Sequence, residues 1–233
     1  MKHSVCRYCG HAIPGKYCYH CGEKTAVTAI TLHSIFHEVF HYFTHLDKGF
    51  GYTLKKLIAQ PGTMQKNYIN GERSRHQKPF SMFFICGTIS GLGYYIINVI
   101  YRKVYGAADY ASEDFFRHYF IILQALLLPF YTLITWLCFK NHKYSYAETL
   151  IMMLYNLAFI FLILVPIIST KLLFPHYENR IVEVIFLLFY SSLTNFNFYK
   201  GNKWLIALQT ILSIGICYIG SQVFSELARK ILY

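Results

Sequence analysis

The chain has 233 residues, a formal net charge of +11, 55% hydrophobic residues and only 14% charged residues. Charged residues make up about a quarter of an ordinary soluble domain, so this composition argues against a soluble protein and points to a membrane protein. Residues 1–79 hold eleven of the 22 Lys and Arg residues and eight of the eleven His residues. The sequence therefore predicts a basic head and an apolar body. No secretory signal is expected, because the first long apolar run begins near Phe80.

The first segment, residues 1–25, predicts a zinc ribbon. It contains two Cys-x-x-Cys pairs separated by eight residues, and a glycine follows each pair. This spacing is typical of two metal-binding turns that bring four thiolates into a tetrahedron. A disulfide pair is the alternative, but the head is expected to be cytoplasmic, where thiols stay reduced. The expected ligands of one structural Zn²⁺ are Cys6, Cys9, Cys18 and Cys21.

A metal in this segment is expected to stabilise the fold rather than to catalyse a reaction. A segment of 25 residues is too short to bury a hydrophobic core. The bound ion would therefore supply the free energy of folding. Four cysteine ligands also leave no coordination position open for a substrate or a water.

Residues 29–46 predict an amphipathic helix with one apolar stripe. Four histidines recur at every fourth position beside that stripe: His33, His37, His41 and His45. The stretch "HEVFH", residues 37–41, matches the H-E-x-x-H pattern, in which two histidines bind zinc and the glutamate activates a water. A zinc-dependent membrane protease, with His37 and His41 as ligands and Glu38 as the base, is therefore one alternative.

The rest of the protease pattern is missing. Asp47 lies six residues beyond His41, but Thr44 stands where short zinc protease motifs have a helix-stopping glycine. We therefore assign no catalytic residue and interpret the histidines mainly as a polar or interfacial helix face. A non-catalytic second metal site on the four histidines is the other alternative. The protein is accordingly not expected to be an enzyme.

Residues 26–79, called the collar here, are expected to lie against the membrane. The approach to the first apolar run carries the basic residues Lys66, Arg73, Arg75 and Lys78. Such residues attract anionic lipid headgroups or a partner protein, although the ordinary excess of positive charge in cytoplasmic segments explains the same residues. No nucleic-acid-binding motif is present, so nucleic acid is not an expected partner.

Residues 80–233 predict an all-α membrane bundle of about five spans, because five apolar runs are long enough to cross about 30 Å of hydrocarbon. These runs are residues 80–101, 116–139, 147–168, 181–199 and 203–224. The fourth is the weakest, since its second half is rich in Ser, Thr and Asn. Asn156 and Gln209 are expected to form interhelical hydrogen bonds. No Asp, Glu, Lys or Arg lies near a span centre, which argues against an ion-coupled transporter.

The distribution of Lys and Arg predicts the orientation. With the head inside, the inner segments hold fifteen of these residues and the outer segments hold seven. The positive-inside rule then places the N-terminus in the cytoplasm and makes the chain a multi-pass protein.

A pattern of nine residues between Thr53 and Phe80 carries a resemblance to a known family. The matching residues are Thr53, Leu57, Pro61, Gly62, Tyr68, Gly71, Arg73, Pro79 and Phe80. With the double Cys-x-x-Cys segment before it and the apolar runs after it, this order resembles the family of domain of unknown function 3667. The resemblance is strongest over residues 1–82. It implies a bacterial inner-membrane protein with a zinc ribbon, and it implies no activity.

The leading functional hypothesis is a non-enzymatic membrane anchor, scaffold or assembly factor. Its zinc ribbon and collar would dock a cytoplasmic protein partner or anionic lipid, and the bundle would sit in the bilayer, alone or as a homo-oligomer. The alternatives are the zinc-dependent protease described above and a channel or transporter of small solutes. The latter would use the polar half of the fourth span as its path.

Overall fold

The computed structural model of the chain describes residues 4–6, 9–13, 15–22, 49–106, 120–174 and 179–232. Apart from short turns, its regular structure is helical, with one antiparallel strand pair near the N-terminus. Strands β1 (Ser4–Val5) and β2 (Ala12–Ile13) pair with Ser4 opposite Ile13. The helix expected over residues 29–46, and with it His33, His37, Glu38, His41 and His45, lies outside the described residues.

Within the described residues, two short helices belong to the collar, and five longer helices follow. The collar helices are α2 (Phe50–Ala59) and α3 (Thr63–Ile69). The longer helices are α4 (Pro79–Tyr105), α6 (Phe120–Cys138), α7 (Tyr146–Ser169), α8 (Arg180–Phe198) and α9 (Lys203–Leu232). Two 3-10 turns, η2 (Lys140–His142) and η3 (Thr170–Leu172), lie in the connections.

Four of the described helices are long and apolar enough to cross a membrane: α4, α7 with η3, α8 and the first 22 residues of α9. They correspond to four of the five expected spans. The remaining one, residues 116–139, corresponds to α6, which is apolar over Ile122–Cys138 but shorter. Its expected first residues lie outside the described part of the chain. The structure therefore shows four helices of spanning length where the sequence predicts five.

The polar residues in the second half of helix α8 face the interior of the bundle. Ser191, Thr194 and Asn195 are buried, whereas Ile185 and Phe189 are exposed on the opposite face. The polar half that weakened this span in the sequence is therefore a contact surface between helices.

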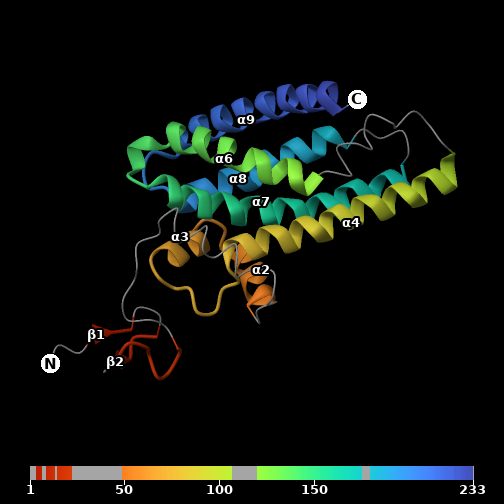
Figure 1. Ribbon diagram of the computed structural model, residues 1–233. Helices are drawn as coiled ribbons and strands as arrows, with labels where there is room; N and C mark the ends of the chain where they lie inside the picture. Colours follow the sequence, from red (N-terminus) through yellow and green to blue (C-terminus); the bar gives the residue numbers. More distant parts are fainter. Residues whose placement is uncertain are drawn as a thin grey trace.

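Helix α7 is the centre of the bundle. It contacts α4, α6 and α8, and α9 lies across α6 and α8 (Figure 1). Leu154, Tyr155 and Ala158 of α7 are completely buried, as expected for a helix that is apolar on all sides. Its first turn is fixed by a capping box, in which Ser145 and Glu148 bond to each other's backbone N–H groups.

The described part of the collar packs directly against the bundle. Leu57, Met64 and Tyr68 of the collar share one hydrophobic core with Met152 and Tyr155 of α7. Tyr155 lies nine residues into α7, which is about 13 Å at 1.5 Å per residue. The collar thus covers the first half of α7, and we call this end of the bundle the collar end.

Candidate functional site: a four-cysteine cluster and a docked collar

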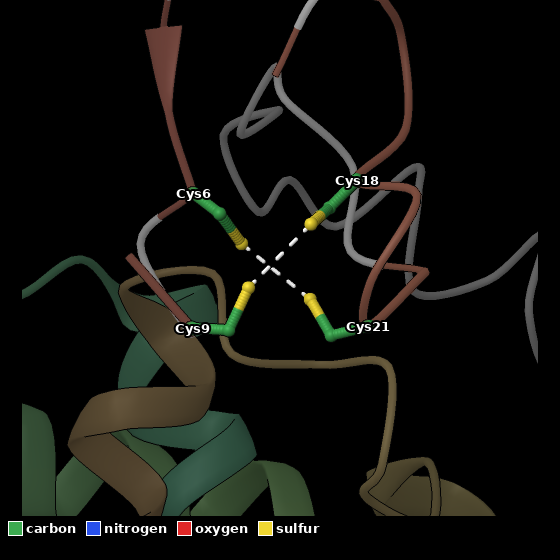
Figure 2. Close-up of side chains that lie close together, drawn as sticks. All are labelled: Cys6, Cys9, Cys18 and Cys21. Carbon is green, nitrogen blue, oxygen red and sulfur yellow. Dashed lines mark hydrogen bonds between the residues drawn. The ribbon is translucent and has the colours of Figure 1, made fainter. Parts of the chain in front are cut away.

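The four cysteines of the N-terminal segment converge on one point (Figure 2). The Sγ atoms of Cys6 and Cys21 are 3.5 Å apart, and so are those of Cys9 and Cys18. All four Sγ atoms lie within 4.8 Å of one another. A zinc ion with Zn–S bonds of about 2.3 Å has tetrahedral S···S edges of about 3.8 Å. The cysteine cluster therefore fits a tetrahedral metal ion.

Each Cys-x-x-Cys pair forms the same turn. The N–H of Gly10 donates to the carbonyl of Cys6 at 2.9 Å, and the N–H of Gly22 donates to the carbonyl of Cys18 at 2.8 Å. Both glycines have φ of 75°, a left-handed conformation that residues with a Cβ adopt only at a cost. The sequence reading of the two glycines as turn residues is confirmed.

The backbone around Cys18 favours its thiolate. Burial raises the pKa of Cys18, but the backbone N–H groups of Cys21 and His20 bond to its sulfur and lower the pKa to about 7. Cys9 differs, because burial and the Cys18 thiol outweigh the N–H of His11 and leave the pKa of Cys9 raised. A metal ion binds the deprotonated form of such ligands and displaces their protons.

Two histidines next to the cluster were not singled out in the sequence. The rings of His11 and His20 stack with centroids 4.3 Å apart, and both side chains are exposed. Together with Cys9 they form a second group of potential ligand atoms. Cys9 belongs to both groups, so an ion held by the four cysteines already uses it. Within the described residues, the four-cysteine group alone provides four ligands.

Of the four basic residues expected to bind lipid or a partner, Arg73 has the best-defined contacts. Its Nε donates to the carbonyl of Tyr68 at 3.1 Å and its Nη2 to that of Ile69 at 3.4 Å. The guanidinium also lies 5.7 Å from the centre of the Tyr68 ring. Arg73 therefore caps the C-terminal carbonyls of α3. Lys78 is the N-cap residue of α4, Lys66 is half-buried in the last turn of α3, and Arg75 is exposed.

His76 is a buried residue of the collar. Its ring lies 5.1 Å from that of Tyr52 and 6.2 Å from that of Tyr68. Its Nδ1 is 3.4 Å from Oγ1 of Thr53, which accepts the N–H of Gln77 at 2.8 Å. Residues 72–78 are thereby tied back onto α2. The partners of His76 are distant in sequence, so the sequence pattern carries no signal for them.

The bundle core contains a network of uncharged polar side chains. Asn156 of α7 donates to Ser191 of α8 at 3.2 Å and accepts from Thr194 at 3.2 Å. Asn195 of α8 donates to Thr210 of α9 at 3.0 Å. Gln209 donates to the carbonyl of Cys138 at 2.8 Å. The expected interhelical roles of Asn156 and Gln209 are confirmed.

Comparison with known families singles out the collar and the start of the bundle. Residues 47–91 match the family described as "Protein of unknown function (DUF3667)". The match supports the resemblance drawn from Thr53 to Phe80, and it leaves residues 1–46 and 92–233 outside. No curated protein and no solved structure matches the chain.

The DUF3667 segment contains the contacts that hold the collar on the bundle. The hydroxyl of Tyr190 donates to the carbonyl of Leu57 at 3.1 Å, and Nδ2 of Asn197 donates to that of Pro61 at 2.9 Å. The hydroxyl of Tyr155 donates to the carbonyl of Gln77 at 2.5 Å. These bonds satisfy backbone carbonyls that packing removes from solvent. The matched residues Leu57, Pro61 and Arg73 therefore have structural roles in this chain.

Proposed function

We propose that the chain is a non-enzymatic, multi-pass anchor of the bacterial cytoplasmic membrane whose zinc ribbon docks a partner protein on the cytoplasmic side. The observation that carries this proposal is the closed four-cysteine cluster. With four thiolates on one ion, no position remains for a substrate, so the metal serves to hold a small surface in shape.

The surface of the ribbon suits a protein partner. Tyr17 and Tyr19 are 58% and 73% exposed, and Val5 is also exposed. Exposed aromatic side chains are the residue type most enriched where proteins bind one another. Residues 1–25 carry four basic residues and one acidic residue, so the complementary partner surface is acidic.

The collar and bundle suit an anchor. The collar is fastened to α7 and α8 by buried hydrogen bonds and a shared core. The basic residues Lys66, Arg75 and Lys78 would lie near anionic headgroups at this end. The protease alternative, with Glu38 as base, rests on residues outside the described part of the chain and stays a sequence hypothesis.

The test compares partners recovered by cross-linking from membranes that contain the full chain. Tyr17→Ala/Tyr19→Ala alters the exposed surface, Cys18→Ser removes a metal ligand, and Tyr95→Ala serves as control at an exposed position of α4. We expect both ribbon variants to lose the same cross-linked protein. The tyrosine variant should keep its zinc, and all variants should insert in the membrane.

Two results would contradict the proposal. One is an unchanged set of cross-linked proteins in both ribbon variants. The other is loss of the partner from Tyr95→Ala to the same extent, which would place the contact in the bundle. Zinc content measured on each purified variant separates a damaged ribbon from an altered surface.

A further inference from the structure

The bundle encloses a cavity of about 200 Å³ between α6, α7, α8 and α9. Helix α7 forms its floor and α9 its roof, because α6 and α8 each contact both of these helices (Figure 1). Its lining residues on α7 run from Met153 to Leu164, and those on α9 run from Ser213 to Ser221. At 1.5 Å per residue these stretches are about 16 Å and 12 Å long. The cavity is therefore long and narrow, and it follows the helix axes.

The end of the cavity nearer the collar is polar but closed. It is lined by Asn156, Ser191, Asn195 and Ser213, all of them buried. Asn156 bonds to Ser191 and Thr194, Asn195 bonds to Thr210, and Ser213 bonds to a backbone carbonyl. Since these groups bond to the protein itself, this end does not require a polar ligand.

The middle of the cavity is apolar. Leu157, Ile160 and Leu164 of α7 face Leu187 of α8 and Ile214 of α9 across it. No Asp, Glu, Lys, Arg or His is among the lining residues. A charged solute would lose its hydration here without gaining a counter-charge.

The other end of the cavity is a neutral polar rim. Gln124 of α6 and Tyr218 and Ser221 of α9 line it. Tyr218 is 41% exposed, and Gln124 and Ser221 are half-buried, in contrast to the buried residues at the collar end. The cavity thus opens away from the collar. The Gln124 amide and the Tyr218 hydroxyl line this opening, and Ser221 Oγ, which donates to the carbonyl of Tyr218 at 2.7 Å, can still accept a hydrogen bond from a ligand.

We propose that this cavity binds an uncharged, single-chain amphiphile taken from the membrane. Its hydroxyl-bearing head lies at the rim of Gln124, Tyr218 and Ser221, and its alkyl chain lies between α7, α8 and α9. The narrow shape excludes a two-chain lipid, and the lining without charge excludes a fatty acid anion. Such a molecule partitions from water into the bilayer because its alkyl chain is apolar, so binding needs no aqueous entry path.

The test uses 1-decanol with a photoactivatable diazirine at its methyl end, added to the purified full chain in detergent. After irradiation, the labelled residues are mapped by mass spectrometry. We expect labelling of α7 and α9 near Leu157 and Ser213, since the methyl end points toward the collar. Excess unlabelled 1-decanol should abolish the labelling, whereas decanoate, which is charged, should compete at least about tenfold less well.

Matched variants separate the cavity from the general surface. Ile214→Phe on α9 and Leu187→Phe on α8 fill the cavity, and we expect each to reduce labelling at least about fivefold. Ile211→Phe and Leu193→Phe place the same ring on exposed positions of the same helices and should label like the wild type. Thermal unfolding of each variant checks that a loss of labelling does not come from misfolding.

Three results would overturn the proposal. They are equal labelling of the filling and control variants when all are folded, equal competition by decanoate, and labelling confined to the rim near Tyr218. The first would mean that the probe coats the bundle, the second that charge is not discriminated, and the third that the ligand lies in the opposite direction.

Discussion

At the scale of single residues, the two glycines of the ribbon show how local backbone conformation brings the four cysteines together. Gly10 and Gly22 hold φ of 75°, and each turns the chain so that its N–H reaches the first cysteine of its pair. An added Cβ at either position would meet no atom within 4 Å. The requirement for glycine is therefore conformational and not steric.

Gly10→Ala should weaken zinc binding by about fivefold, because an L-residue in the left-handed region costs about 1 kcal/mol. The affinity is measured by competition with a chromophoric chelator on the detergent-purified full chain. Gly15→Ala is the matched control, since Gly15 lies in the same segment, has open space around its Cα and does not have a left-handed φ. Equal affinities for the two variants would mean that the turns are not needed to bind the ion.

The clustering of the four cysteines could be predicted from the sequence because its signal is local. Two pairs at fixed spacing and two glycines define the turns without reference to the rest of the chain. The functions of Arg73 and His76 could not be read in this way. The sequence predicted that Arg73 attracts anionic lipid or a partner protein. In the structure, its guanidinium donates to backbone carbonyls of α3. His76 is buried by rings from α2 and α3.

At the scale of elements, the collar is held by a close approach between α3 and α8. Gly62 has φ of 79°, and a Cβ on it would lie 2.1 Å from the carbonyl oxygen of Thr194 and 2.8 Å from the N of Phe198. Only a glycine lets the start of α3 touch the backbone of α8. Pro61, the preceding residue, accepts a hydrogen bond from Asn197 of the same helix.

Gly62→Ala should therefore release the collar from α8. The clash and the left-handed φ together are expected to cost about 3 kcal/mol, which lowers the midpoint of thermal unfolding by roughly 6–12 °C. Gly51→Ala in α2 is the control, because its Cβ would meet nothing within 4 Å and alanine favours a helix. A midpoint for Gly62→Ala within about 2 °C of that control would show that the contact with α8 is dispensable.

The helices could be predicted well from the sequence, but their contacts could not. Apolar run length gave four spans within a few residues, since hydropathy is a property of each segment alone. The docking of the collar joins residues that are far apart in sequence, such as Leu57 and Tyr190. The cavity likewise depends on how α6 and α8 are spaced by α7 and α9. The docking of the collar and the shape of the cavity therefore depend on how the helices pack, which the sequence of each segment alone does not reveal.

At the scale of the whole molecule, the described connections between helices lie at two opposite ends of the bundle. Near the collar, the ring of Phe139 stacks on that of Tyr199 at 4.2 Å, and His142 lies 4.9 Å from the same ring. At the other end, the hydroxyl of Tyr105 donates to the carbonyl of Leu172 at 2.8 Å. The loops after α6 and α8 thus lie together at the collar end, and the end of α4 lies beside η3 at the other end.

This arrangement makes the crossing of α6 testable, although the described part of that helix is shorter than the others. If α6 crosses the membrane, Val104 at the end of α4 and Asn141 after α6 lie on opposite sides, and Lys200 after α8 lies on the side of Asn141. All three side chains are exposed. We expect a membrane-impermeant maleimide to label Val104→Cys in intact spheroplasts. Asn141→Cys and Lys200→Cys should react only after the membrane is opened.

The parent chain, with its seven native cysteines, sets the background of this labelling. Reaction of Val104→Cys and Asn141→Cys from the same side would show that α6 does not cross. The reverse pattern, with only Asn141→Cys and Lys200→Cys labelled in intact spheroplasts, would place the collar outside the cytoplasm. The ribbon precedes the collar without an expected span between them, so that result would also put the four cysteines in an oxidising compartment, where a disulfide pair becomes the favoured state.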